Sequence, residues 1–301
     1  KNYKEWSKLF PKNKAILYFA SEGKKGELPA YLSKGFLKSG FFVFRNSWGE
    51  DATQMVVKAG PKAFWHCQPD NGTFEMWFNG KNLFPDSGSY VYAGSKEVNE
   101  ERNWFRQTAV HNTLTLNNKN LDQTNSKTLL WQPEGDIQTL VTENPSYKNL
   151  THRRSIFFVN NTYFVIVDEA IGAAKGFVNL HYQMPKGKIA NSREDMTFVT
   201  EFESGSNMKL QCFGPDGMSM KKEEGWASTA YRKKFKRMNV SFNVKKEDDA
   251  VRYITIIYPM KDSADAPAMS AKFKTKKFDG KNLKVEVKVG GKKQSLKYTL
   301  Q

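Results

Sequence analysis

The stretch SIFFVNNTYFVIVDEA, residues 155–170, decides the fold class of this chain. Two runs of β-branched and aromatic residues, 156–159 and 163–167, flank a short polar segment. Such runs are typical of β-strands. Asn160 and Asn161 tolerate the positive φ angles that a tight turn needs, so the stretch predicts an antiparallel β-hairpin.

Runs of the same kind recur from about Gly35 to the end of the chain, separated by Asn, Gly, Asp and Pro. They include TQMVVKAG, TFEMWFNG, YVYAG, HNTLTLNN, VRYITIIYP and LKVEVKVGG. No helical pattern alternates regularly with them, which argues against a parallel α/β sheet. We therefore predict an all-β fold, a large antiparallel multi-sheet β-sandwich. The small-residue stretch 172–176 breaks the pattern and predicts the start of a second layer.

Residues 1–30 differ in composition from the rest of the chain. YKEWSKLF and NKAILYFA are short and typical of helices, and SEGKKGELPA is typical of a linker. We predict that residues 1–30 are the end of a preceding helical domain with its linker, and that 31–301 form the sandwich domain. The chain starts with neither Met nor a signal-peptide pattern, so we expect a processed product or a fragment.

The 47 Lys and Arg against 31 Asp and Glu give a net charge of +16. This charge favours a polyanionic partner, although a merely solvated basic surface is the alternative. Much of the excess is lysine, whereas arginine is the usual reader of base edges. Since no nucleic-acid-binding motif and no apolar run of ~18–20 residues occur, we expect neither a nucleic-acid nor a membrane partner. The two cysteines allow at most one disulfide.

Polar residues interrupt the aromatic stretch FWHCQPDNG, residues 64–72. If this stretch is a strand, His66 and Gln68 project from the same face. Asp86 follows in PDSGSY, and His111 opens HNTLTL. Histidine, carboxylate and amide oxygen together can bind a divalent cation, and a hydrogen-bonded polar cluster without metal is the alternative.

Two further histidines occur within strand-like runs. For His152 and His181 we expect hydrogen-bonded core positions, because a lone histidine in an apolar run is most often of that kind.

Four segments, taken in order, resemble the C-terminal β domain of the heparinase II/III family over roughly residues 30–260. They are LKSGFFVFRNSWGEDATQMVVKAGP, FWHCQPDNGTFEMWFNGKNLFPDSGSYVYAG, RNWFRQTAVHNTLTLNNKNL and HRRSIFFVNNTYFVIVDEA. Within the family the chain is similar to the members that cleave heparan sulfate. The resemblance implies an N-terminal α/α toroid packed on the sandwich, with the substrate in the cleft between them. Residues 1–30 are then the end of the toroid.

The resemblance also implies a chemistry. Family members cleave uronic-acid-containing chains by β-elimination, which leaves an unsaturated uronate. His66 matches the family's catalytic histidine in an H-x-H-x-D pattern and takes the acid/base role, for which histidine has a suitable pKa. Asp70 either completes this pattern or belongs to an ordinary Asp-Asn-Gly turn. Arg45, Arg102 and Arg106 are candidates for binding sulfate or carboxylate.

The second histidine of the pattern is a metal ligand in relatives, together with residues matching Asp86 and His111. Here Gln68 stands in its place. An amide oxygen favours calcium and leaves zinc as the less favoured cation. We expect this divalent cation to be structural, linking the chain segments behind His66.

The implied function is therefore that of the C-terminal domain of a heparan sulfate lyase. Other groups of the reaction belong to the toroid, so we expect the chain alone to be inactive. The alternative is a non-catalytic binding module for acidic polysaccharide. The expected partners are heparan sulfate or a related glycosaminoglycan and the protein's own toroid. We expect a monomer, located in the bacterial periplasm or secreted.

Overall fold

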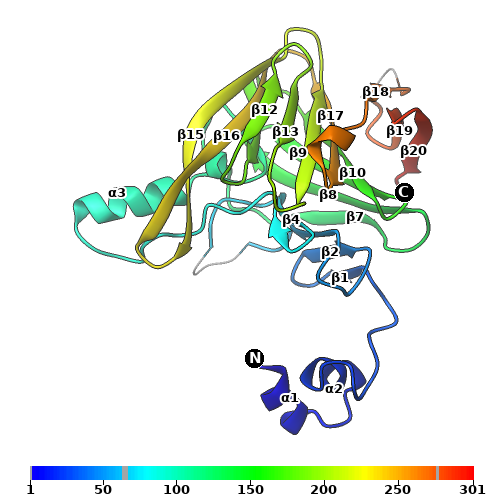
Figure 1. Ribbon diagram of the computed structural model, residues 1–301. Coiled ribbons are helices and arrows are strands. Elements are labelled where there is room, and N and C mark those ends of the chain that lie inside the picture. The colour runs from blue at the N-terminus through cyan, green and yellow to red at the C-terminus, as the bar shows by residue number, and fades with distance from the viewer. Residues whose placement is uncertain (1, 63–66, 276–277) are drawn as a thin grey trace.

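The computed structural model describes residues 2–62, 67–275 and 278–301. It consists of four antiparallel sheets with few, short helices (Figure 1). The predicted all-β, multi-sheet fold is confirmed, as is the short helical segment at the N-terminus.

An eight-stranded sheet forms the centre of the molecule. Its strands, in spatial order, are β12 (Ile189–Ser192), β13 (Thr197–Thr200), β14 (Asn207–Phe213), β17 (Ala250–Met260), β10 (Tyr163–Ile171), β9 (Leu150–Val159), β8 (Ile137–Tyr147) and β7 (Lys127–Gln132). The predicted hairpin is β9 with β10. Its turn contains Asn160 and Asn161 at φ angles of 50° and 52°, as expected from the residue type.

Three smaller sheets cover the central one. The four-stranded sheet has the order β15 (Ser219–Ala230), β16 (Lys233–Lys246), β11 (Gly176–Gln183) and β6 (Leu114–Leu116). The five-stranded sheet has the order β1 (Lys34–Phe36), β2 (Phe41–Arg45), β3 (Gln54–Lys58), β4 (Thr73–Phe78) and β5 (Lys81–Asn82). The three-stranded sheet is β18 (Met269–Phe273), β19 (Asn282–Val289) and β20 (Lys292–Thr299).

The central hairpin is buried on both faces. Ile156 and Phe158 pack into a core shared with the four- and five-stranded sheets, whereas Phe157 and Val159 pack against the three-stranded sheet. A strand covered on both sides needs apolar residues at every position, which explains the unbroken apolar runs of this hairpin. The chain leaves the central sheet after β10 and enters the four-stranded sheet at β11, so the stretch 172–176 is a change of sheet. It is not the start of that layer, because β6 already belongs to the four-stranded sheet.

Two helices, α1 (Tyr3–Leu9) and α2 (Lys14–Ala20), lie below the sheets in Figure 1 and bury no residue completely. Short 3₁₀ helices span Thr108–Val110 and Ser263–Asp265. No helix in the described part of the chain is long and apolar enough to cross a membrane.

A third helix, α3 (Lys96–Phe105), was not predicted from the strand pattern. The run YVYAG that precedes it was predicted as a strand and forms none. Tyr90, the first residue of that run, has a φ angle of 57°, which is not a strand conformation. The helix itself contains mainly charged and polar residues that form helices readily, so it gives no apolar periodicity by which to recognise it.

Candidate functional site

The described candidates for cation binding, Gln68, Asp86 and His111, lie outside the strands. His66 lies outside the described residues, so the structure does not test its assignment. Gln68 and Asp70 lie in a loop that leads into β4. The expectation that residues 66–68 form a strand is wrong for the described part, because Pro69 lacks an N–H group and Gly72 adopts a φ angle of 87°.

Two hydrogen bonds hold this loop against the segment that ends in His111. Arg106 donates from Nη2 to the Cys67 carbonyl oxygen at 2.9 Å. Thr108 donates its hydroxyl hydrogen to the Pro69 carbonyl oxygen at 2.6 Å. The loop after His66 is therefore tied to the C-terminal end of α3 and to the 3₁₀ helix that follows it.

Asp86 and His111 form the centre of the candidate site. His111 Nδ1 lies 2.6 Å from Asp86 Oδ2, and the histidine is completely buried. The other carboxylate oxygen, Oδ1, accepts the backbone N–H of Gly88 at 2.7 Å. Burial alone would lower the pKa of His111, but the adjacent Asp86 outweighs it and raises the pKa above its ordinary value. For Asp86, burial raises the pKa, and His111 with the Gly88 N–H brings it below the usual value.

Among the predicted cation ligands, two buried atoms have no hydrogen-bond partner in the described structure. They are Gln68 Oε1 and His111 Nε2. Unpaired buried polar atoms are unusual in folded proteins. An amide oxygen and an imidazole nitrogen are both ligands for divalent cations, so Gln68, Asp86 and His111 fit such an ion. Binding would displace a proton from His111.

The side chains that most often bind metal ions do not form a separate cluster in the described chain. Within residues 2–62, 67–275 and 278–301, no group of three His, Cys, Asp or Glu side chains is arranged to hold a metal. Among the described residues, the proposed set of three ligands therefore includes the amide of Gln68.

An arginine that the sequence analysis did not single out supports the Asp86 turn. Arg237, on β16, donates from Nη1 to the Pro85 carbonyl and from Nη2 to the Ser87 hydroxyl at 2.5 Å. Burial lowers the pKa of Arg237 to about 10, against the opposing effect of Asp86 and Glu75. Arg237 lies in the lysine-rich run KKFKRMNV, where nothing in the sequence distinguishes it from its basic neighbours. Only its inward position in the fold distinguishes it, and sequence alone does not give that position.

Asp70 lies close enough to His111 to act on it electrostatically. Its Oδ1 atom accepts a hydrogen bond from Lys58 Nζ at 2.5 Å, and its negative charge contributes to the raised pKa of His111. It is also in the turn that leads into β4, since Thr73 donates its backbone N–H to the Asp70 carbonyl. Both interpretations of Asp70 thus remain compatible with the structure.

A fully buried ionic network lies beneath the loop. Arg154 donates to both oxygens of Asp168, at 2.7 and 3.2 Å, and His152 Nε2 lies 2.6 Å from Asp168 Oδ1. Arg154 Nη1 also donates to the carbonyl oxygens of Gly72 and Asn112, at 2.5 and 2.6 Å. One guanidinium thereby fixes the end of the loop that contains Gln68 and the residue next to His111.

The histidines outside the site behave as predicted. His152 and His181 are buried and hydrogen-bonded, His152 to Asp168 and His181 to Thr115 at 2.8 Å. Burial lowers the pKa of His181 to about 4, so this side chain is neutral near pH 7. Neither histidine belongs to the candidate site.

The other two arginines proposed to bind sulfate or carboxylate, Arg102 and Arg45, lie in different parts of the fold. Arg102, on α3, lies with its guanidinium 5.5 Å from the ring centroid of Tyr92. Arg45, on β2, stacks on Trp48 at 3.9 Å and donates to Gln54 at 3.0 Å. Trp48 in turn contacts Phe19 of α2, so Arg45 lies toward the N-terminal helices and not beside Asp86 or His111.

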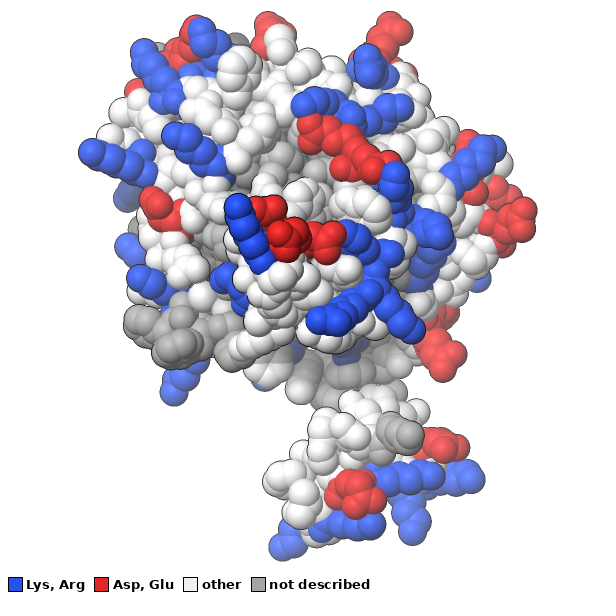
Figure 2. Space-filling model, turned by 90° about the vertical axis from the view of Figure 1, so that its left-hand side faces the viewer, with Lys and Arg blue, Asp and Glu red and all other residues white. Residues whose placement is uncertain are grey.

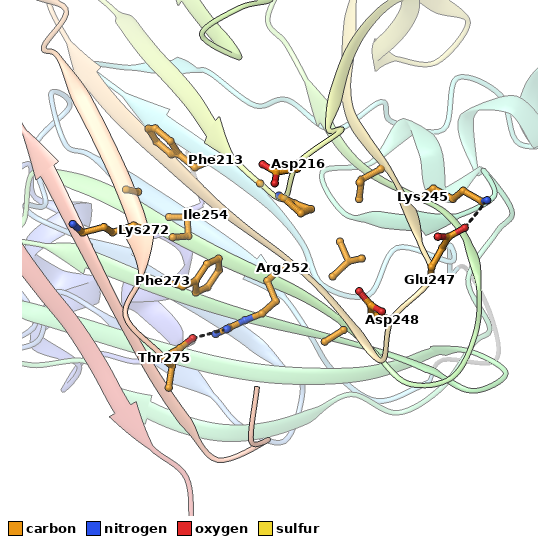
Figure 3. A pocket seen from close by; sticks show the side chains of 16 residues that line it. Phe213, Asp216, Lys245, Glu247, Asp248, Arg252, Ile254, Lys272, Phe273 and Thr275 are labelled. Carbon is orange, nitrogen blue, oxygen red and sulfur yellow. Dashed lines mark hydrogen bonds and ion pairs between the residues drawn. The ribbon is translucent and has the colours of Figure 1, made fainter. Parts of the chain in front are cut away.

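A pocket in the described structure lies away from this site. It has a volume of about 650 Å³ and lies between β14, β17 and β18 (Figure 3). Arg252 on its wall stacks on Phe273 at 3.9 Å and donates to the Thr275 carbonyl. Three basic and three acidic side chains line the pocket, so it offers no net charge for an acidic polysaccharide.

Curated proteins match all or nearly all of the chain. It is 78% identical to a heparin-sulfate lyase of Bacteroides stercoris, covering 100% of this chain and 45% of that protein. A heparin-sulfate lyase of Pedobacter heparinus is 38% identical, covering 97% of this chain and 45% of that protein. The chain thus spans slightly less than half the length of these relatives.

Comparison with solved structures points to the same group of proteins. A heparinase III structure superimposes with a TM-score of 0.98 at 79% identity, covering 99% of this chain and 47% of that one. The heparan sulfate lyase HepC from Pedobacter heparinus gives 0.94 at 37% identity, again covering 99% and 47%. The family described as Heparinase II/III-like, C-terminal, matches residues 29–272. The chain therefore belongs to the heparinase II/III family, of which it represents the C-terminal part.

Proposed function

We propose that this chain is the β-sandwich part of a lyase that cleaves heparan sulfate or a related glycosaminoglycan by β-elimination. Identity along nearly the whole of this chain to part of two named heparin-sulfate lyases supports the proposal. The observation that carries it is the buried Asp86–His111 pair, because it lies beside the loop that follows His66.

In this proposal His66 provides acid/base catalysis. Removal of the uronate C5 proton breaks the C5–H bond, and its electrons form the C4–C5 double bond as the C4–O bond breaks. The leaving oxygen takes a proton, so no water is consumed. The chain's described residues position the loop next to His66: Arg106 holds Cys67, and Thr108 holds Pro69. The groups that neutralise the uronate carboxylate and protonate the leaving oxygen come from the preceding domain.

An exposed apolar surface supports a partner domain on the N-terminal side. Nine of the twelve exposed large apolar side chains in the described structure fall within residues 3–41. They are Tyr3, Trp6, Leu9, Phe10, Leu28, Tyr31, Phe36, Leu37 and Phe41. Apolar surface of this extent is typical of an interaction site. We propose that the preceding toroid covers it, and that the protein is periplasmic or secreted, as the resemblance implies. We also propose that it is a monomer.

The proposed function is tested by comparing this chain alone with the chain joined to its preceding domain. This chain alone is expected to release no unsaturated uronate from heparan sulfate, whereas the chain joined to its preceding domain releases it continuously. The measurement is ultraviolet absorbance of the unsaturated product. Lack of signal from the joined protein at saturating calcium or zinc would favour the alternative, a binding module for acidic polysaccharide, for which the net charge of +16 is the supporting observation.

For the cation we propose calcium, held by Gln68, Asp86 and His111, with zinc as the second choice. The Asp86→Asn variant is expected to bind calcium at least roughly 10- to 100-fold more weakly, because a charged carboxylate ligand of the ion is replaced by a neutral amide. Isothermal titration of calcium into the protein measures the affinity. Asp216→Asn removes an equal charge outside the site and is the matched control. If neither calcium nor zinc binds to the unsubstituted protein, the cluster is a hydrogen-bonded one without metal.

A further inference from the structure

The tip of the long β15–β16 hairpin is attached to the segment that follows Asp86. Arg232, at the tip, has a φ angle of 58° and donates its backbone N–H to the Tyr90 carbonyl at 2.8 Å. Ser228 donates its backbone N–H to the Ser87 carbonyl at 2.9 Å. The surface of the hairpin tip is thus continuous with the candidate site.

Helix α3 connects the same tip to the loop after His66. Lys234, near the tip, forms an ion pair with Glu101 of the helix and lies 4.8 Å from the centroids of two aromatic rings. At the other end of the helix, Arg106 donates to the Cys67 carbonyl. Lys234 is therefore a structural cation, which fixes the hairpin to the helix.

Other cations here have no such partner. Arg102 lies 5.5 Å from the ring of Tyr92, and Arg232 lies 5.5 Å from the ring of Tyr231. In the described chain no carboxylate lies within ion-pair distance of Arg102, Arg232 or Lys233. Both tyrosines are more than 60% exposed. We name these five residues the basic-aromatic rim. Figure 2 views the molecule from this side, where basic and acidic side chains lie interspersed.

On helix α3, the arginines project from a different side than Glu97 and Glu100. Arg102 and Arg106 are four residues apart and therefore project from the same side of α3. Glu97 and Glu100 are five and two residues from Arg102, and at 3.6 residues per turn they project from other sides. A row of positive charge thus leads from Arg106, beside the candidate site, to the hairpin tip.

We propose that the basic-aromatic rim is a subsite for the acidic polysaccharide beyond the cleaved bond, where it binds sulfate or carboxylate groups of the flanking sugars. The proposal rests on the proposed function and extends it. The guanidinium groups of Arg102 and Arg232 offer paired N–H donors to such oxyanions. Tyr92 and Tyr231 offer exposed rings to the apolar faces of sugars.

The test uses the full-length enzyme with the double substitution Arg232→Gln and Lys233→Gln. KM for polymeric heparan sulfate is expected to rise roughly three- to tenfold, because exposed ion pairs contribute little each and two are removed. The value of kcat is expected to stay within about twofold, because neither side chain reaches the reacting atoms. Lys284→Gln with Lys288→Gln removes the same charge from exposed positions of β19 and is the matched control.

Each outcome has one interpretation. If the double variant and the control show the same KM, the subsite is wrong while the proposed function stands. If KM is unchanged and the melting temperature of the full-length protein falls, the rim contacts the preceding domain instead, which also overturns the proposal. If the unsubstituted enzyme is inactive, the proposed function fails. Binding to immobilised heparan sulfate then still tests the rim, since only the Arg232 and Lys233 variant should bind more weakly than the control.

Discussion

Replacing His66 with Ala in the full-length enzyme is expected to lower kcat by about two to four orders of magnitude, because a positioned acid/base group contributes an effect of that size. KM for heparan sulfate should change little, since binding of the chain relies on other groups. The rate is measured by the absorbance of unsaturated uronate under saturating substrate. This split between kcat and KM marks a group that acts in the transition state rather than in substrate binding.

Two comparisons make the His66 result interpretable. The melting temperature of the His66→Ala variant should equal that of the unsubstituted protein, which shows that the fold is retained. The bell-shaped pH dependence of kcat/KM should also lose one limb, since that limb reports the essential acid or base of the free enzyme. Unchanged turnover would remove His66 from the mechanism and leave the binding module as the better interpretation.

The Asp168→Asn substitution is expected to lower the free energy of unfolding by about 3–5 kcal/mol, because it leaves the buried guanidinium of Arg154 without a counter-charge. Asp168 and Arg154 are each at most 1% exposed, and the pair is shared with His152. Chemical denaturation followed by tryptophan fluorescence measures the loss. The loop that ends at Gly72 should loosen first, since Arg154 also holds its carbonyl oxygen.

The pH dependence gives an independent check of the Asp168 prediction. Burial raises the pKa of Asp168, but Arg154 and the hydrogen bond with His152 outweigh it and bring the pKa below its ordinary value. Its stabilising effect is therefore complete above the unfolded value of about 3.9 and is lost as pH falls through the lower folded value. This acid-side loss should be smaller in Asp168→Asn.

A substitution in an exposed ion pair is the matched control for the buried Asp168–Arg154 pair. Glu247 pairs with Lys245 at the surface, where both side chains are about two-thirds exposed. Glu247→Gln should leave the denaturation midpoint unchanged, because exposed ion pairs contribute little. If Asp168→Asn were as mild as this control, Arg154 would have another counter-charge and the network would not hold the loop as argued.

The sequence predicted the local features of the fold because local physics controls them. The β9–β10 hairpin follows from its apolar runs and from two asparagines that accept positive φ angles. The change of sheet near 172–176 follows from a break in the same pattern. Helix α3 was missed, because its polar residues do not show the apolar spacing that identifies a helix packed on a core.

For the candidate site, in contrast, the sequence predicted less and the tertiary structure showed more. Resemblance to the family indicated Gln68, Asp86 and His111, but not the groups that hold them. Arg237 reaches the Asp86 turn from about 150 residues away in the chain. Arg237 therefore looked like one more member of a lysine-rich run, and only its inward position shows its role.

The sequence by itself thus determined the all-β class, the hairpins and the family, since these depend on residue type and on neighbours a few positions apart. Only the tertiary structure decided which charges are buried and what they hold. Arg154 joins Asp168, 14 residues away, to Gly72 and Asn112, which are 82 and 42 residues away. A buried charge must find its partners wherever the packed chain brings them, and no periodicity along the sequence records that choice.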